Sequence, residues 1–76
     1  MMNRAWTHRV VKVMRGKDGS FFDYPTAGTF GDAAAAGEYA EAFALEQTIA
    51  GVTSGRVEVR ARKGGAVVAL YRFGQP

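Results

Sequence analysis

Residues 56–63 constrain the fold of this chain more than any other segment, because apolar and charged side chains alternate along them. The alternation places Val57, Val59 and Ala61 on one side, and Arg56, Glu58, Arg60 and Arg62 on the other. A period of two is typical of a strand with one buried face and one solvated face. Gly64-Gly65 follows, and this pair tolerates the positive φ of a tight turn, so the sequence predicts a hairpin that returns over residues 66–73.

The register of this hairpin follows if a two-residue turn pairs Lys63 with Ala66. The residues then predicted to be buried against the rest of the fold are Val57, Val59, Ala61, Val68 and Leu70. The opposite, solvated face would pair Arg62 with Val67, Arg60 with Ala69, Glu58 with Tyr71, and Arg56 with Phe73.

Another hairpin is predicted earlier in the chain, and we call it the first hairpin and the one over residues 56–73 the second. The first hairpin has strands over residues 6–15 and 20–24 around the turn Gly16-Lys17-Asp18-Gly19. Pro25 ends the second strand and suits an edge. A two-residue turn at Asp18-Gly19 and a four-residue loop over 16–19 are both possible, and both pair odd residues with even ones. The predicted core face is Val11, Val13, Phe22 and Tyr24; the other face holds His8, Val10, Lys12, Met14, Phe21 and Asp23.

A helix is predicted between the hairpins, ending near Ala50 with Gly51 as its stop. Thr29 as N-cap fits a capping box with Asp32, and Asp32 as the N-cap itself is the alternative. Small residues recur at spacings of three and four, a face that lets a helix lie close to a sheet: Ala33, Ala36, Gly37, Ala40 and Ala44. We therefore expect one α+β domain over residues 1–76, ββαββ in order, with an antiparallel sheet, one helix on one face, frayed residues 1–5 and a tail at 74–76.

Charge is unevenly distributed along the chain, whose formal net charge is +3. Residues 30–50 contain four acids and no Lys or Arg, whereas the remainder carries ten basic and three acidic residues. The folded molecule should therefore have an acidic side and a basic side. The chain has no cysteine for a disulfide or thiolate site, no apolar run of the roughly 20 residues that a membrane span needs, and no apolar core of a signal peptide near its start, so a soluble, cytoplasmic protein is predicted.

The basic face of the second hairpin is the predicted binding surface: Arg56, Arg60, Arg62, Tyr71 and Phe73. Arginine pairs with phosphate or carboxylate, and exposed aromatic rings stack on bases. The alternative is a merely solvated face whose aromatic rings shelter beneath arginine stems. No catalytic, cofactor or metal site is expected, because His8 is the single histidine and the glycine-rich turns do not lead from a strand into a helix.

The layout resembles short uncharacterised ββαββ domains of bacteria and phages, and is similar to small phage anti-CRISPR proteins. The matching residues are Asp18-Gly19, Thr29-Phe30, Ala33, Ala40, Ala44 and Gly64-Gly65. The resemblance implies a non-catalytic inhibitor that occludes a protein or nucleoprotein with an anionic surface; many anti-CRISPRs are acidic mimics of nucleic acid, and the basic sheet departs from that pattern. A small nucleic-acid-binding domain that uses the same face is the alternative, and a homodimer is left open.

Overall fold

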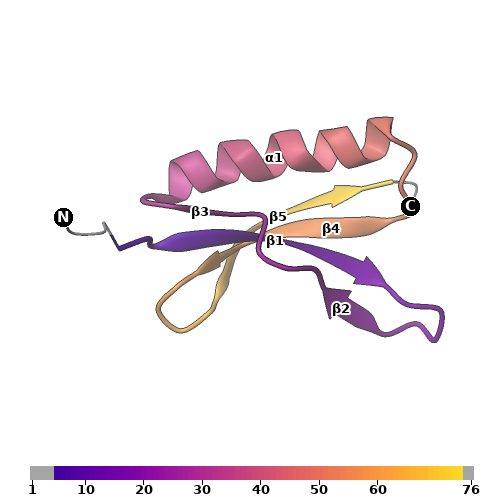
Figure 1. Cartoon of the computed structure of the whole chain (residues 1–76), viewed down its shortest axis with the longest axis horizontal. Coiled ribbons are helices and arrows are strands. Elements are labelled where there is room, and N and C mark those ends of the chain that lie inside the picture. Colours follow the sequence, from indigo (N-terminus) through magenta and orange to yellow (C-terminus); the bar gives the residue numbers. More distant parts are fainter. Residues whose placement is uncertain (1–4, 75–76) are drawn as a thin grey trace.

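The computed structural model describes residues 5–74, which form one helix and an open sheet of five strands (Figure 1). The elements are β1 (His8–Arg15), β2 (Phe21–Asp23), β3 (Gly28–Phe30), α1 (Ala33–Ile49), β4 (Gly55–Ala61) and β5 (Val67–Phe73). The order β2-β1-β4-β5 is antiparallel throughout, and β3 pairs with the first half of β1. The α+β class is confirmed. The strand order is more complex than two hairpins around a helix, because β3 adds a strand between β2 and α1.

The ends of α1 are fixed by its capping residues. Asp32 is the N-cap, and its Oδ1 accepts a hydrogen bond from the Ala35 N–H at 2.7 Å. Thr29 lies in β3 instead, so the alternative prediction for the N-cap is the correct one. At the other end Gly51 has φ +78°, and the N–H groups of Gly51 and Val52 donate to the carbonyls of Thr48 and Gln47. This pair of bonds is a Schellman motif, which confirms the predicted glycine stop.

The core lies between α1 and one face of the sheet. Ala36, Ala40 and Ala44 are the buried residues of α1, as the small-residue face predicts. They pack on larger buried side chains of the strands, which are Val10, Met14, Val57, Val59 and Phe73. Alanines along the contact let the helix backbone approach the strands closely. No helix within residues 5–74 is both long and apolar enough to cross a membrane.

The predicted register of the first hairpin is wrong. Arg15 pairs with Phe21 and Met14 with Phe22, so odd residues pair with odd ones. The Gly16 N–H donates to the Ser20 carbonyl at 2.6 Å, which closes a loop of three residues rather than two or four. Gly19 has φ +88° in this loop, the conformation that three-residue hairpin loops require of their last residue.

The face assignment of the first hairpin changes with its register. Val10, Met14 and Phe22 lie on the side of α1, and Lys12 on the same side donates to the Gln47 amide of the helix at 3.1 Å. Val11 and Val13 are buried on the opposite side, outside the cluster that packs on α1. The predicted core face therefore mixed residues from both faces of the sheet.

The second hairpin turns at Gly64 and Gly65, whose φ angles of +81° and +71° confirm the predicted turn conformation. Its register is nevertheless displaced by one residue. The Ala61 N–H donates to the Ala66 carbonyl, and β5 contains an irregularity that leaves Val68 without a partner in β4. The observed pairs are Arg56 with Arg72, Val57 with Tyr71, Glu58 with Leu70, and Val59 with Ala69.

Beyond the irregularity at Val68, this displacement exchanges the two faces of β5, whereas Val67 remains on the solvated face as predicted. Val57 and Val59 are buried beneath α1 as predicted, whereas Val68 and Leu70 are exposed, contrary to the prediction. Tyr71 and Phe73 lie on the helix side instead, and Phe73 is a buried core residue. Most of the residues predicted to fray, 1–5 and 74–76, fall outside the described part of the chain; within it, the Gly74 N–H donates to Thr48 Oγ1 at 3.1 Å.

Candidate anion-binding site

The sheet face opposite α1 is the candidate site, and we call it the open face. Cross-strand partners lie on the same side of a sheet, so the observed pairs define its members. They are Arg9, Val11, Val13 and Arg15 of β1, Phe21 and Asp23 of β2, Thr29 of β3, Arg56, Glu58 and Arg60 of β4, and Val67, Leu70 and Arg72 of β5. No helix or strand within residues 5–74 covers this face (Figure 1). Five arginines therefore share a face with two carboxylates.

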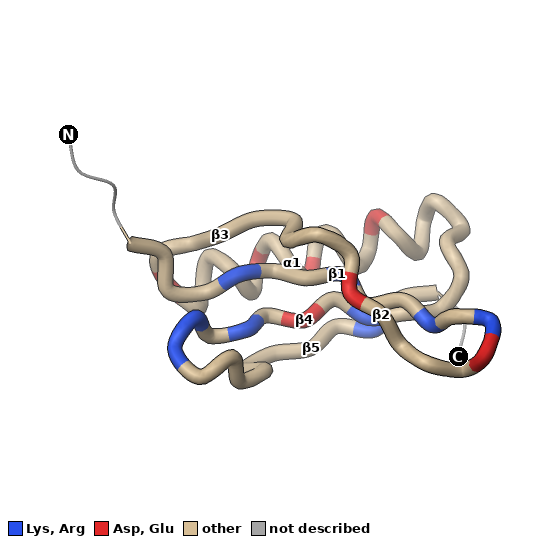
Figure 2. Tube along the Cα trace, turned by 60° about the horizontal axis from the view of Figure 1, so that its bottom comes forward, with Lys and Arg blue, Asp and Glu red and all other residues tan. Residues whose placement is uncertain are grey.

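The two sides of the molecule differ in charge. Figure 2 shows Lys and Arg on the strands and hairpin turns, interspersed there with a few acidic residues, and charged residues of acidic type alone along α1. The acids of the helix and its cap are Asp32, Glu38, Glu41 and Glu46. Because α1 covers the opposite side of the sheet, its negative charge does not neutralise the open face locally. An anion approaching the molecule is attracted to the open face and repelled by the helix.

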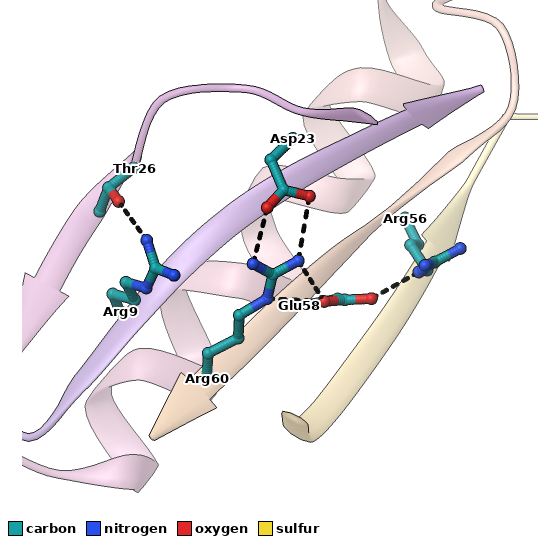
Figure 3. Close-up of polar contacts among 6 residues, drawn as sticks. All are labelled: Arg9, Asp23, Thr26, Arg56, Glu58 and Arg60. Carbon is teal, nitrogen blue, oxygen red and sulfur yellow. Dashed lines mark hydrogen bonds and ion pairs between the residues drawn. The ribbon is translucent and has the colours of Figure 1, made fainter. Parts of the chain in front are cut away.

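A network of four charged side chains lies at the centre of the open face (Figure 3). The Glu58 carboxylate accepts a hydrogen bond from Arg56 Nε at 2.6 Å and another from Arg60 Nε at 2.8 Å. Arg60 also donates to both carboxylate oxygens of Asp23, at 2.8 and 3.1 Å. Glu58 is only 4% exposed and the Arg60 side chain only 16%. Arg60, predicted as a solvent-facing contact residue, is thus engaged by two carboxylates of its own chain.

The network shifts the pKa values of Glu58, Asp23 and Arg60. Burial acts to raise the pKa of Glu58, but the hydrogen bonds and charges of Arg56 and Arg60 outweigh it and hold this pKa below its ordinary value. The hydrogen bonds from Arg60 likewise lower the pKa of Asp23. Conversely, Asp23 and Glu58 raise the pKa of Arg60. All of these groups are therefore charged at neutral pH.

Acid should weaken the fold through this network. A carboxyl group whose folded-state pKa is lowered stabilises the fold above its unfolded-state pKa of about 4, and this stabilisation is lost as the pH falls through the folded value. We expect the free energy of unfolding, measured by urea denaturation, to decrease as the pH falls below about 4. Glu58→Gln removes one titrating group, so its decrease should be shallower. Equal slopes for the two proteins would contradict a stabilising role for the Glu58 carboxylate.

The five residues predicted as a binding surface do not lie together. Arg56 and Arg60 share the open face, as predicted. Arg62 lies beyond the end of β4, where its guanidinium stacks on the Trp6 ring at 4.7 Å and donates to the Trp6 carbonyl at 3.4 Å. Tyr71 and Phe73 pack on the helix side. Their predicted grouping with the arginines is wrong because of the register displacement in β5.

Arg56 lies at one end of the sheet, next to three other residues of the open face. These are Arg15, Phe21 and Arg72, which were not among the residues predicted to bind. The Arg56 guanidinium lies 4.6 Å from the centre of the Phe21 ring, and the Arg15 guanidinium lies 5.9 Å from the same ring. Together with Arg72 they line a cavity of about 580 Å³, which we call the arginine pocket; its other lining residues are Thr48, Ser54, Gly55, Phe73 and Gly74. The correct register, which pairs Arg56 with Arg72 and Arg15 with Phe21, would have identified this group.

The described residues, 5–74, contain no group of three or more His, Asp or Glu side chains suited to hold a metal ion. The arrangement is instead suited to bind anions, because guanidinium groups form paired hydrogen bonds with carboxylates and phosphates. Comparisons with protein-family models, with curated proteins and with solved structures found no match to this chain.

Proposed function

We propose that this chain is a non-catalytic interaction module whose open face covers an anionic surface of a protein or nucleoprotein partner. The observation that carries the proposal is the composition of that face: five arginines accompany two carboxylates, and no element of residues 5–74 lies over them. Covering a partner's surface in this way would block other molecules from it. Such occlusion is also what the resemblance to anti-CRISPR proteins predicts.

Exposed apolar side chains on and beside the open face favour a protein partner. Phe21, Val67 and Leu70 belong to the face, Val68 adjoins it in β5, and all four are exposed. Arginine and aromatic residues are enriched in protein interfaces relative to the rest of the surface, and a few such residues carry most of the binding energy. A partner that supplies acidic groups around an apolar centre would complement this surface.

Nucleic acid is the second candidate, because the exposed Phe21 ring lies beside Arg15 and Arg56. An aromatic ring among arginines suits a base stacked next to its phosphate. The two candidates differ in salt dependence. Binding to nucleic acid should weaken log-linearly with salt concentration, with a slope that reports the number of phosphates contacted.

Site-specific photo-crosslinking tests the proposal. A photoreactive phenylalanine analogue replaces Leu70 on the open face, and the matched control carries it at Ile49, which is exposed on α1. In cells that produce the protein, we expect a discrete, nuclease-resistant protein adduct from position 70 and none from position 49. Adding Arg72→Glu to the position-70 protein should abolish the adduct, because it reverses charge beside the crosslinker. An adduct from position 49 alone would contradict the proposal, and a nuclease-sensitive adduct from position 70 would favour nucleic acid.

A further inference from the structure

The arginine pocket is a concave site at one end of the open face, next to the charged network, with which it shares Arg56. It forms where β1 ends, β2 begins, β4 begins, β5 ends and the last turn of α1 lies nearby, so five elements contribute to its lining. Its volume of about 580 Å³ falls within the range of sites that hold small molecules. Phe21 forms an apolar side of it, and Arg15, Arg56 and Arg72 contribute guanidinium groups.

The positive charge of this pocket is only partly compensated. Arg56 shares the Glu58 carboxylate with Arg60. Arg15 and Arg72 are exposed, and no carboxylate of residues 5–74 lies within 4.0 Å of either guanidinium. Two full positive charges therefore border the cavity. A phosphate monoester carries a charge of about −1.5 to −2 at neutral pH and balances them, whereas a single carboxylate would leave one arginine without a counter-charge.

The Phe21 ring offers an apolar, flat surface to the group that a phosphate in this pocket would carry. The ring is 53% exposed and borders the cavity next to two guanidinium groups. A planar base can stack on such a ring, and stacking of this kind contributes about 1–3 kcal/mol per base. An aliphatic phosphate would leave that apolar surface in water. The lining thus complements a flat aromatic group linked to a phosphoryl group.

We propose that the arginine pocket binds a nucleoside 5′-monophosphate, with the phosphoryl group between Arg15 and Arg72 and the base against Phe21. The nucleotide is either free in solution or the phosphorylated 5′ end of a nucleic-acid strand, since both present the same chemistry. This site shares Arg15, Phe21, Arg56 and Arg72 with the open face, but nucleotide binding is measured on the isolated chain and requires no partner. A failed photo-crosslinking experiment would leave the proposed nucleotide site standing. A failed nucleotide titration would likewise leave the proposed partner surface standing.

Isothermal titration calorimetry on the full chain tests this site with five probes. These are adenosine 5′-monophosphate, adenosine, inorganic phosphate, and a short oligoadenylate with or without a 5′ phosphate. We expect the monophosphate to bind at least 10-fold more tightly than adenosine or inorganic phosphate, because each of these lacks one of the two contacts. Tighter binding of the phosphorylated oligonucleotide than of the monophosphate would identify a strand end as the ligand; equal or weaker binding would identify the free nucleotide.

Variants locate the binding. Arg72→Gln and Arg15→Gln should each weaken binding of the monophosphate at least 10-fold. Phe21→Leu should weaken binding of the monophosphate but leave binding of inorganic phosphate unchanged. Arg62→Gln is the matched control, because Arg62 stacks on Trp6 away from the pocket. Thermal melting of each variant verifies that it is folded. The proposal is overturned if the wild-type protein binds neither the monophosphate nor the phosphorylated oligonucleotide, or if folded Arg15→Gln and Arg72→Gln proteins bind as tightly as the wild type.

Discussion

Arg60→Glu should lower the free energy of unfolding by about 3 kcal/mol, the lower end of the usual cost of removing one partner of a buried ion pair, because Glu58 keeps its hydrogen bond from Arg56. Glu58 is nearly inaccessible to solvent and would lose the hydrogen bond from Arg60 Nε. The new carboxylate would also lie next to Asp23, which Arg60 now holds through two hydrogen bonds. Urea denaturation at neutral pH measures the loss, and a chain of this size is expected to be largely unfolded after it.

Arg72→Glu is the matched control for this substitution. It makes the same change on the same face, at an exposed position with no carboxylate neighbour among the described residues. Such surface substitutions usually change stability by no more than about 0.5 kcal/mol. If both variants unfolded at the same urea concentration as the wild type, the network around Glu58 would contribute nothing to stability.

Val59→Asp should abolish folding. Val59 has no solvent-exposed surface and belongs to the cluster that packs against the alanines of α1. The substitution would place a carboxylate in this cluster, whose buried members are all apolar, and an unpaired charge in an apolar interior costs far more than a small domain can offset. Circular dichroism should show loss of the helix signal and of the cooperative melting transition.

Val67→Asp is the matched control for Val59→Asp. Val67 is 48% exposed at the start of β5, opposite Arg60. An added carboxylate there remains hydrated, so the melting temperature should stay close to that of the wild type. A folded Val59→Asp protein with an unchanged melting curve would contradict the placement of Val59 beneath α1.

The features that the sequence predicted correctly depend on short stretches of chain. The alternation around Val59 indicates a strand, Gly64-Gly65 adopts positive φ, and Gly51 ends the helix. Each of these follows from the preferences of a few consecutive residues. Local propensity and turn chemistry therefore sufficed to place the helix and the four principal strands.

The registers were wrong because loop length decides them, and a displacement by one residue moves every side chain to the other face. The first loop holds three residues, and Val68 is an extra residue in β5. Apolar side chains occur on both faces of these strands, as in Val10 with Val11 and Ala69 with Leu70. The hydrophobic pattern thus did not specify which face was buried.

The errors in the candidate site follow from the same cause. With the register displaced, Tyr71 and Phe73 were assigned to the solvated face and Leu70 to the core. The engagement of Arg60 by Asp23 joins residues 37 positions apart, and no local pattern indicates it. The arginine pocket likewise combines the ends of elements that are distant in the sequence.

The identity of the open face is the central claim, and nuclear Overhauser effects from the Tyr71 ring test it most directly. The structure places the Tyr71 hydroxyl beside Gly37 of α1, 3.5 Å from where a Cβ on that glycine would lie. We predict cross-peaks between the Tyr71 ring protons and the Gly37 α protons, and none between the Leu70 methyl groups and the alanines of α1. Cross-peaks from the Tyr71 ring to the side chains of Glu58 or Arg60, together with contacts of Leu70 to α1, would contradict this assignment of the open face.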